Sequence, residues 1–423
     1  MSRTGRFSTA LRDYARRQVE HLGNADIVVG IPAYYSDESL AHVIKTVAEG
    51  LDQHYPDRRS LIIIADGGST DDTREVAQSV ESHHFNIDVL VTIYRGIPGK
   101  GSAFRAIFEA AKYLRASGVA LFDSDLKSIK TGWVRNILSP VFEGYDFVAP
   151  DYSRYKFDGT ITNTIAYNLT RALYGVNIRQ PIGGDFGMSS AMVSHCLNQD
   201  VWDTDIAKFG VDIWMTITAI TGGFRICQTR LGAKIHGEKD PAADLGPMFR
   251  EVVGTIFNLL DKDRSYLENV KETVNTPIYG EAVGEEPVSF EVNLEKLVEY
   301  FRIGMKNFGP VWANIIEEED YATVNKLALV RNLKNFNLPT ETWVRIVYRY
   351  AAYFCKTERQ RFKILDTLIP LYNARVASLI LILQEKNQAE AEEFYDSQAM
   401  AFESMREYLI ELLRNHDAVP EIL

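Results

Sequence analysis

Residues 27–35 read IVVGIPAYY and residues 61–72 read LIIIADGGSTDD, and each is a short apolar run bounded by Gly, Pro, Asp or Ser. Three more runs of this kind follow, IDVLVTIYRG at 87–96, GVALFDSD at 118–125 and YDFVAPDYS at 145–153. Strands that alternate with helices of about 10–15 residues predict crossover units. We therefore expect an α/β fold with a mixed, mostly parallel sheet that is flanked by helices.

Polar clusters follow three of these strands, after Ile31, Ala65 and Phe122. In open α/β sheets ligands bind at the carboxyl ends of the strands. The sequence therefore predicts that the chemistry of this protein lies along one edge of the sheet.

The sequence on either side of the strand region is helical in character. Residues 6–22 carry apolar residues at rough helical spacing with arginines between them, which predicts a docked surface helix, with an anionic membrane surface as the alternative. Segment 272–290, with two prolines and four glutamates, predicts a linker or long loop. We expect an N-terminal helical extension at 1–25, a catalytic domain at 26–256 and a helical domain at 257–423.

The clearest predicted helix lies near the end of the chain. Pro370 is expected to kink it. One face of this helix carries Leu365, Leu368, Tyr372, Val376, Leu379 and Leu383. A helical domain packed by such a face is the simplest interpretation, and apolar surface left over on it could form a homodimer.

Composition limits the classes of function. The 423 residues are 46% hydrophobic and 24% charged, which is typical of a globular protein. The net charge of -11 argues against a nucleic-acid partner. Three scattered cysteines argue against a disulfide framework and favour a cytoplasmic location. We find no apolar run of about 20 residues and no signal-peptide core, so we expect no membrane span.

Two carboxylates, Asp123 and Asp125, end the fourth strand on either side of Ser124. Carboxylates are hard oxygen ligands that suit Mg²⁺ or Mn²⁺, and a metal there could neutralise a diphosphate. A D-x-D triplet also arises by chance, and aspartates at strand ends often cap the next helix. The triplet alone leaves both interpretations open.

Three other clusters lie at predicted strand ends or before helices. Residues 32–38 and 66–71 contain carboxylates and glycines that could contact a base and a ribose, although each could also be a turn with an N-cap. Residues 98–101, Pro-Gly-Lys-Gly, form a flexible loop with one ammonium group before a helix, which suits phosphate contact. This loop is not a P-loop, because the second glycine spacing and the Lys-Ser/Thr pair are missing.

The order of the motifs resembles the retaining GT-A glycosyltransferases that make glucosyl-3-phosphoglycerate or mannosylglycerate. The resemblance spans residues 27–256, and mannosylglycerate synthases also carry a helical domain after the catalytic one. Seven motifs carry it: PAYYSDE at 32–38, DGGSTDDT at 66–73, PGKG at 98–101, DSDL at 123–126, QPIGGD at 180–185, FGVDI at 209–213 and LGAKIH at 231–236.

The resemblance implies a retaining hexosyltransferase that makes a compatible solute from a nucleotide diphosphate sugar, a UDP- or GDP-hexose. It implies that a divalent metal, Mg²⁺ or Mn²⁺, is bound by Asp125, with Asp123, and by His236. It also implies a donor site in which Lys100 reaches the diphosphate. The residues implied for that donor site are Pro32, Ala33, Glu38, Asp66, Ser69, Lys100, Ser124, Gly183 and Gly184.

Two acidic positions are implied near the reacting centre. Asp185 would hold sugar hydroxyls, at a position where family members often carry Glu. Asp212 would orient a hydroxyl of the donor or the acceptor. In an inverting enzyme the same carboxylate would be the general base, but the relatives retain configuration, so we assign Asp212 a positioning role.

The acceptor is implied to be a small hydroxy acid such as glycerate. Arg154 and Thr162 match the pair that grips the glycerate carboxylate, and an arginine fork suits a carboxylate. Relatives that use 3-phosphoglycerate carry arginine where this chain has Thr160, and Lys234, a candidate acceptor-binding residue, also replaces an arginine. Because lysine does not reproduce a bidentate arginine contact, we expect unphosphorylated glycerate rather than 3-phosphoglycerate.

Three alternatives remain open from the sequence. A glycosyltransferase acting on a lipid or polysaccharide would need an anchor such as residues 6–22. A nucleotidyltransferase would need a glycine-rich triphosphate loop after the first strand, where this chain has residues 32–35, Pro-Ala-Tyr-Tyr. A nucleotide-binding or scaffolding module without activity would not need the intact acidic and basic motif residues.

Overall fold

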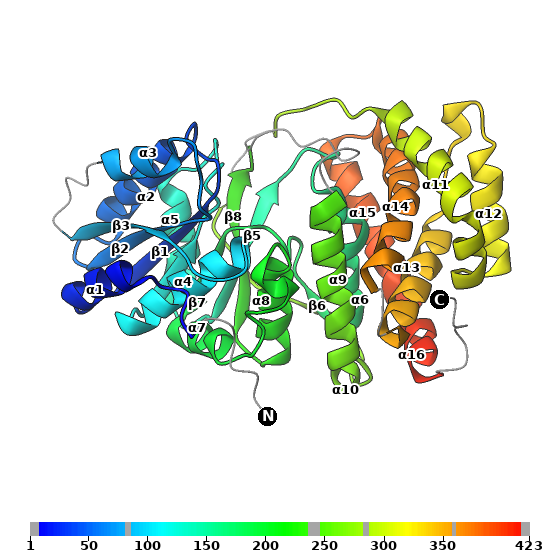
Figure 1. Cartoon of the computed structure of the whole chain (residues 1–423). Coiled ribbons are helices and arrows are strands. Elements are labelled where there is room, and N and C mark those ends of the chain that lie inside the picture. The colour runs from blue at the N-terminus through cyan, green and yellow to red at the C-terminus, as the bar shows by residue number, and fades with distance from the viewer. Residues whose placement is uncertain (1–7, 81–85, 236–245, 282–286, 358–360, 416–423) are drawn as a thin grey trace. The chain divides into compact units, whose positions relative to one another are not determined.

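The computed structural model describes residues 8–80, 86–235, 246–281, 287–357 and 361–415 (Figure 1). The chain divides into two compact units. The first, the α/β unit, comprises Met1–Ser153, Arg179–Gly237 and Thr276–Val288. The second, the helical unit, comprises Arg154–Ile178, Glu238–Asn275 and Ser289–Leu423.

The α/β unit is built on one eight-stranded sheet with the order β10-β8-β5-β7-β4-β1-β2-β3. Strand β7 is antiparallel to both of its neighbours, whereas the other pairs are parallel. The predicted mixed, mostly parallel sheet is therefore confirmed. The strands are β1 Ile27–Ala33, β2 Ser60–Asp66, β3 Ile87–Ile93, β4 Gly118–Leu121, β5 Phe147–Ser153, β7 Phe186–Ser189, β8 Ile226–Ala233 and β10 Ile278–Tyr279.

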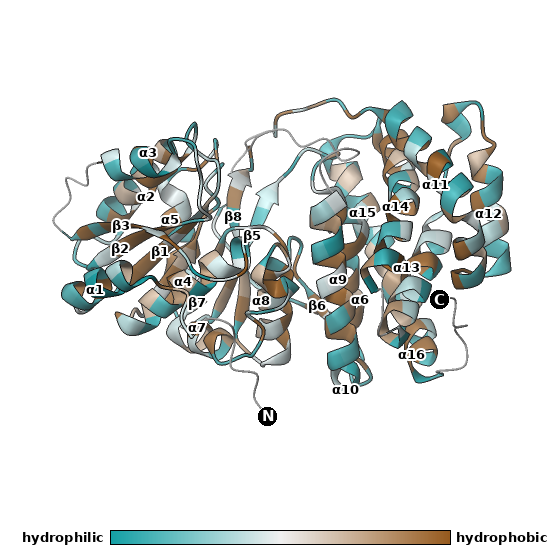
Figure 2. Ribbon diagram, in the orientation of Figure 1, coloured by the Kyte–Doolittle hydropathy of each residue, from teal (hydrophilic) through white to brown (hydrophobic). Residues whose placement is uncertain are grey.

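The central strands β1 and β2 are mostly apolar and are buried at all but one position, as expected for a sheet that is covered on both faces (Figure 2). Side chains alternate along a strand, so Ile62 and Ile64 share one face, where they pack with residues of α2 and α5. On the other face Gly30 leaves room for α4, since a Cβ atom there would lie 2.5 Å from Ile107. The helices of this unit are α2 Leu40–His54, α3 Thr73–Ser79, α4 Lys100–Tyr113, α5 Thr131–Phe142, α7 Ser190–Leu197 and α8 Val211–Thr221.

The N-terminal helix α1, Asp13–Leu22, docks on the α/β unit beside α4 and β3 (Figure 1). Ala15 and Val19, its buried residues, form the apolar face. The carboxylate of Glu109 in α4 accepts hydrogen bonds from the backbone of Ala10 at 2.9 Å and Leu11 at 3.2 Å, which fixes the chain before the helix. This arrangement fits the prediction of a docked surface helix at residues 6–22, of which residues 6 and 7 lie outside the described part of the chain.

Strand β10 lies inside the segment that was predicted to be only a linker or loop. Its two residues pair with β8 at the edge of the sheet. The side chain of Gln228 donates to Thr276 Oγ1 at 2.7 Å, and the Gln228 backbone N–H donates to Pro277 O at 2.8 Å. A two-residue strand held by such long-range contacts leaves no periodic pattern in the sequence, so the prediction of a linker or long loop did not include this edge strand.

The helical unit contains the predicted apolar helix as α14, Arg361–Leu383. All six predicted face residues are buried, and Pro370 lies inside the helix. Gly304 of α11 permits close packing there, because a Cβ atom at Gly304 would lie 2.6 Å from Pro370 Cγ. The unit contains the π-helix η1 Thr162–Ala166 and α6 Tyr167–Tyr174, α9 Gly246–Lys262, α10 Arg264–Leu267, α11 Leu294–Ile315, α12 Glu318–Ala328, α13 Thr340–Lys356, α14, α15 Gln388–Ser404 and α16 Arg406–Arg414.

Helix α14 is also long and apolar enough to cross a membrane, contrary to the expectation that no such segment is present among the residues described. However, 78% of its most apolar window is buried inside the protein. Helices in the core of globular proteins pass the same test of length and composition, and this degree of burial is typical of them. We therefore interpret α14 as the core helix of the helical unit.

The two units do not follow the predicted boundary at residue 256. Residues 154–178 group with the helical unit because α6 packs on α15. Arg171 of α6 forms ion pairs with Asp396 at 2.7 Å and Glu403 at 2.8 Å, both in α15. A segment from the middle of the chain thus belongs to a unit that is otherwise C-terminal, which local sequence patterns do not reveal.

Candidate active site

Five charged residues from distant parts of the chain meet in the α/β unit, and we call them the charge cluster. Lys100 Nζ lies 2.8 Å from Asp123 Oδ1 and 3.0 Å from Asp212 Oδ2. Lys234 Nζ lies 2.9 Å from Asp123 Oδ2 and 3.0 Å from Asp185 Oδ2. Asp123 follows β4, Asp185 precedes β7, Lys234 follows β8, and the other two lie in the first turns of α4 and α8. The structure thus brings together five of the predicted site residues.

Burial and neighbouring charge set the protonation of the charge cluster. Burial would raise the pKa of Asp123, but Lys100 and Lys234 outweigh it and hold that pKa well below its usual range. Burial would lower the pKa of Lys100, but Asp123 and Asp212 raise it above its usual value. For Asp185 and Asp212 burial wins, and both pKa values are raised although a lysine opposes the shift at each. Burial thus disfavours the charged form of all three carboxyl groups, and only at Asp123 do the lysines outweigh it.

Asp212 has one carboxylate oxygen without a hydrogen-bond partner among the residues described. Its Oδ2 accepts from Lys100, whereas its Oδ1 is buried and has no hydrogen-bond partner among the residues described. The residue is only 6% exposed. Buried polar atoms are normally hydrogen-bonded, so an orphaned oxygen beside a charged cluster indicates a position for a hydroxyl donor. This geometry fits the predicted positioning role.

The glycines beside Lys100 serve close packing of the backbone. A Cβ atom at Gly99 would lie 2.6 Å from Ala207 O, and one at Gly101 would overlap Ile206 O and lie 2.8 Å from the carbonyl carbon of Ala207. The 3₁₀ helix η2, Asp205–Ala207, therefore lies directly against the Lys100 loop. The expectation that this loop is flexible is corrected, because its glycines are packed against backbone. Their packing brings the segment before α8, and with it Asp212, to Lys100.

We predict that Gly101→Ala reduces transfer activity by about 100-fold, because displacement of a catalytic group by about 1 Å can cost that much. The added methyl group would push η2 away and lengthen the 3.0 Å contact between Lys100 and Asp212. Steady-state kinetics and thermal unfolding would be measured together. Gly132→Ala is the matched control, since nothing lies within 4 Å of its Cβ position near the start of α5. Full activity in Gly101→Ala would contradict this packing role.

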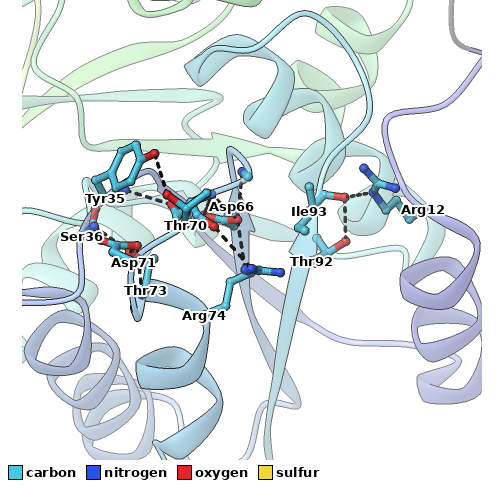
Figure 3. A network of polar contacts seen from close by, with 12 residues as sticks. Arg12, Tyr35, Ser36, Asp66, Thr70, Asp71, Thr73, Arg74, Thr92 and Ile93 are labelled. Carbon is cyan, nitrogen blue, oxygen red and sulfur yellow. Dashed lines mark hydrogen bonds and ion pairs between the residues drawn. The ribbon is translucent and has the colours of Figure 1, made fainter.

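The residues predicted to contact the base and ribose brace their own loop (Figure 3). Asp66 is fully buried and accepts from Gly68 N at 2.9 Å and Ser69 Oγ at 2.6 Å. Ser69 Oγ in turn accepts from the backbone N–H of Tyr35 at 3.0 Å. The expectation that Asp66 and Ser69 contact the nucleotide through their side chains is corrected, because these side chains form hydrogen bonds with other protein groups.

Ser124, in the middle of the D-x-D triplet, joins this network. Its Oγ lies 2.8 Å from Ser36 Oγ, and its backbone carbonyl accepts from Ser39 Oγ at 2.8 Å. The Ser36 backbone N–H donates to Thr73 Oγ1 at 2.9 Å (Figure 3). The loops after β1, β2 and β4 are thereby fixed to one another. Of the other predicted donor residues, Pro32 and Ala33 end β1, and Glu38 is exposed five residues later.

Two exposed tyrosines after β1 were not among the predicted site residues. Tyr34 and Tyr35 are 62% and 51% exposed, and their ring centroids lie 4.4 Å apart in an edge arrangement. The Tyr34 ring covers Gly67, where a Cβ atom would lie 2.9 Å from Cδ2. Tyr35 has a left-handed φ of 50°, which is uncommon for a bulky residue. Two aromatic residues directly after a buried strand are the sequence signal that would have identified them.

The D-x-D residues differ in their fitness for a metal. Both oxygens of Asp123 are held by ammonium groups, so the expectation that it is a metal ligand is not met in this arrangement. Asp125 is half-buried in the loop after β4, and its carboxylate has the oxygen chemistry that Mg²⁺ and Mn²⁺ prefer. His236 lies outside the described residues. Within the described ranges no group of three or more His, Cys, Asp or Glu residues could hold a metal ion.

The predicted acceptor residues Arg154 and Thr162 lie together in the helical unit. A Cβ atom at Gly159 would lie 3.6 Å from Arg154 Cδ and 3.8 Å from Thr162 Oγ1. Arg154 forms an ion pair with Asp158 at 2.9 Å, and Thr160 Oγ1 lies 2.5 Å from the hydroxyl of Tyr372. Thr162 is the first residue of the π-helix η1, a rare element that often marks functional positions.

Lys234 differs from the prediction. It was expected to bind the acceptor, but its side chain is only 4% exposed and its ammonium group is bound by two carboxylates and the Gly183 carbonyl. Asp185 is likewise fully buried, with both carboxylate oxygens accepting hydrogen bonds from protein groups. The expectation that Asp185 holds sugar hydroxyls is therefore corrected.

Part of the α/β unit matches a known protein family. Residues 28–192 match the family model described as Glycosyl transferase family 2. This segment, which is less than half of the chain, is similar to glycosyl transferase family 2 domains. The match confirms the resemblance to glycosyltransferases, and the matched segment contains Lys100, Asp123 and Asp185 of the charge cluster.

Relatives outside the family model agree with a glycosyltransferase. The chain is 25% identical over 251 residues to the glucosyl-3-phosphoglycerate synthase of Mycolicibacterium paratuberculosis, a match that covers 55% of this chain and 71% of the relative. It is 28% identical over 220 residues to the glycosyltransferase AglJ of Haloferax volcanii, covering 49% and 67%. The first relative is named as a glucosyl-3-phosphoglycerate synthase and the second as a glycosyltransferase, in agreement with the match to glycosyl transferase family 2.

Solved structures of similar proteins include glucosyl-3-phosphoglycerate synthase from Mycobacterium tuberculosis. Its complex with Mn²⁺, UDP and glucosyl-3-phosphoglycerate has a TM-score of 0.44 and 22% identity, covering 60% of this chain and 84% of that one. Its complex with Mg²⁺ and UDP has a TM-score of 0.45 and 22% identity, covering 62% and 85%.

Proposed function

We propose that the protein is a retaining, metal-dependent hexosyltransferase that moves glucose or mannose from a UDP- or GDP-hexose to a hydroxyl of glycerate or 3-phosphoglycerate. The product would be a compatible solute made in the cytoplasm. The observation that carries the proposal is the position of the Lys100 ammonium group, between Asp123 and Asp212, beside strand ends of the segment that matches glycosyl transferase family 2. Such a group can neutralise a departing diphosphate beside a carboxylate that orients a hydroxyl.

A divalent cation, Mg²⁺ or Mn²⁺, would be held by Asp125 together with His236 and would supply Lewis-acid stabilisation of the leaving phosphate. Lys100 adds a second positive charge on the diphosphate when it turns from Asp123 toward the ligand. The charge cluster places Lys100 between Asp123 and Asp212 before the substrate arrives, so its positive charge is already near the proposed diphosphate position.

Retention of configuration follows if the acceptor attacks on the face from which the diphosphate leaves. The sugar–phosphate bond breaks, the acceptor hydroxyl forms the new glycosidic bond, and its proton passes to the departing phosphate oxygen. No protein nucleophile is required in this scheme. Asp212 Oδ1 accepts a hydrogen bond from a substrate hydroxyl and so holds the reactants in place. Its role is positioning, because the leaving phosphate removes the proton.

Arg154 and Thr162 support a carboxylate-bearing acceptor, because both flank Gly159 and an arginine pairs well with a carboxylate. At Thr160, where phosphoglycerate-using relatives carry arginine, the hydroxyl is engaged by Tyr372. This contact favours glycerate over 3-phosphoglycerate as the acceptor. The lipid-acceptor alternative gains nothing from α1, whose apolar residues are used in docking.

A substrate panel tests this function. Purified protein would be incubated with UDP- and GDP-glucose and -mannose, with glycerate or 3-phosphoglycerate, and with Mg²⁺ or Mn²⁺. Mass spectrometry would identify the product, and proton NMR would give its anomeric configuration. We expect an α-linked hexosylglycerate. If no nucleotide sugar is transferred or hydrolysed under any of these conditions, a binding module without activity becomes the better account.

We predict that Asp125→Asn lowers transfer by at least about 100-fold, the usual cost of losing a charge-stabilising group. Added Mn²⁺ should not restore the rate, because the variant lacks an anionic oxygen ligand. Metal binding by calorimetry would be measured alongside activity. Asp57→Asn, at an exposed loop position, serves as the matched control. Transfer by Asp125→Asn at the wild-type rate in the presence of chelator would rule out this metal role.

A further inference from the structure

Lys234 has the environment of an internal brace. Its ammonium group donates to Asp123 Oδ2 at 2.9 Å, to Gly183 O at 2.8 Å and to Asp185 Oδ2 at 3.0 Å. A lysine ammonium group has three N–H donors, and these contacts account for all of them. Lys234 therefore joins the loop after β4 to the loop before β7, which are far apart in the sequence.

The loop before β7 is fitted closely around this ammonium group. Asp185 Oδ1 accepts from the backbone N–H of Asp123 at 2.7 Å, and its Oδ2 accepts from the Tyr152 hydroxyl as well as from Lys234. Gly184 has a left-handed φ of 93°. A Cβ atom at Gly184 would overlap Asp123 Oδ2 and lie 3.1 Å from Lys234 Nζ. The backbone conformation of residues 183–185 therefore depends on where the side chains of Asp123 and Lys234 lie.

We propose that Lys234 is a positioning residue that fixes loop 180–185 against Asp123 and thereby sets the place of the donor sugar. The inference rests on the proposed function, together with the expectation from the resemblance that Gly183 and Gly184 of this loop belong to the donor site. Its physical basis is that removal of the ammonium group leaves the buried carboxylate of Asp185 without its positive partner, and the loop then rearranges to hydrate it. The acceptor is not involved in this step.

The shape of lysine matters as well as its charge. Three acceptors converge on one nitrogen atom, which suits a compact ammonium group and not a planar guanidinium. The Tyr152 ring also lies close, with its centroid 5.0 Å from Nζ. An arginine at this position would therefore keep the charge but force the loop to move. The two substitutions Lys234→Met and Lys234→Arg separate these contributions.

The kinetic test compares wild type, Lys234→Met, Lys234→Arg and the control Lys112→Met, which changes an exposed lysine of α4. We expect Lys234→Met to lower kcat by about 100-fold and to raise the donor KM, with an unchanged acceptor KM, as a misplaced reactant requires. Lys234→Arg should lower kcat by about tenfold. A rise confined to the acceptor KM, or wild-type kinetics in both variants, would overturn the proposal.

A readout that needs no activity separates this inference from the proposed function. Hydrogen exchange of the backbone amides of residues 182–186 should be faster in Lys234→Met than in wild type or Lys112→Met, and unchanged exchange there would overturn the inference. The double variant Lys234→Met/Asp185→Asn removes both charges, so it should recover thermal stability but not kcat. Wild-type protein that transfers no sugar would refute the proposed function alone, whatever the exchange experiment gives.

Discussion

Replacement of Lys100 by methionine is expected to lower hexosyl transfer by about 1000-fold, the upper range for loss of one preorganised charge-stabilising group. The variant loses the ammonium group that lies 2.8 Å from Asp123 Oδ1 and 3.0 Å from Asp212 Oδ2. Three buried carboxylates then share one lysine. The pKa of Asp212, already raised by burial, should rise further because Lys100 no longer opposes that rise. The measurement is kcat/KM for the donor at saturating acceptor.

Stability must be separated from catalysis in this variant. Breaking a buried ion pair by removing one partner typically costs about 3–5 kcal/mol, so Lys100→Met should also unfold more easily. The double variant Lys100→Met/Asp212→Asn removes the uncompensated charge and should regain part of the stability without regaining transfer. Lys112→Met should behave as wild type. Transfer by folded Lys100→Met within tenfold of wild type would refute the assigned role of the ammonium group.

The second large effect is expected in the helical unit, at Arg375 in α14. This arginine is completely buried and has only neutral acceptors among its hydrogen-bond partners: Leu338 O at 2.7 Å, Thr340 Oγ1 at 2.9 Å and Gln398 Oε1 at 2.5 Å. Burial lowers its pKa to about 10, so it still carries its charge at neutral pH. Arg375→Met leaves those three acceptors without a donor. We expect the free energy of unfolding to fall by about 3–5 kcal/mol.

Chemical denaturation followed by far-ultraviolet circular dichroism measures this loss. The double variant Arg375→Met/Gln398→Leu removes a donor and its main side-chain acceptor together, which is often nearly neutral, so it should be more stable than the single variant. Asn163 O, which accepts from Gln398, keeps a second donor in Asn168 Nδ2. If Arg375→Met is as stable as wild type, the hydrogen bonds of this arginine do not hold the helical unit together.

Much of the fold followed from local patterns. The runs at 27–35 and 61–72 became β1 and β2 because buried parallel strands require continuous apolar sequence. The face of α14 was predictable because helical periodicity places its residues on one side. Strands β7, β8 and β10 were not among the predicted runs, and β10, with two residues, carries no readable period. Their pairing depends on partners far away in the chain.

The candidate site was predictable in its membership and less so in its roles. Lys100 and Asp123 were expected from local sequence motifs, and Asp185, Asp212 and Lys234 from the resemblance to GT-A glycosyltransferases. The contacts between these residues were not predicted, and they change the expected roles of three of them. Asp123 forms ion pairs with two lysines, and Asp185 forms an ion pair with Lys234. Residue type indicates what a side chain can bind, but burial decides whether a ligand can reach it.

By itself the amino-acid sequence determined the α/β class, the edge of the sheet that carries the polar groups, and the resemblance to glycosyltransferases. These depend on local periodicity and on short motifs. Only the tertiary structure decided that Lys234 pairs with Asp123 across 111 positions, and that residues 154–178 join the helical unit. Both outcomes arise because a buried charge needs a partner and an apolar helix needs a neighbour, and the folded chain can supply either from any distance along the sequence.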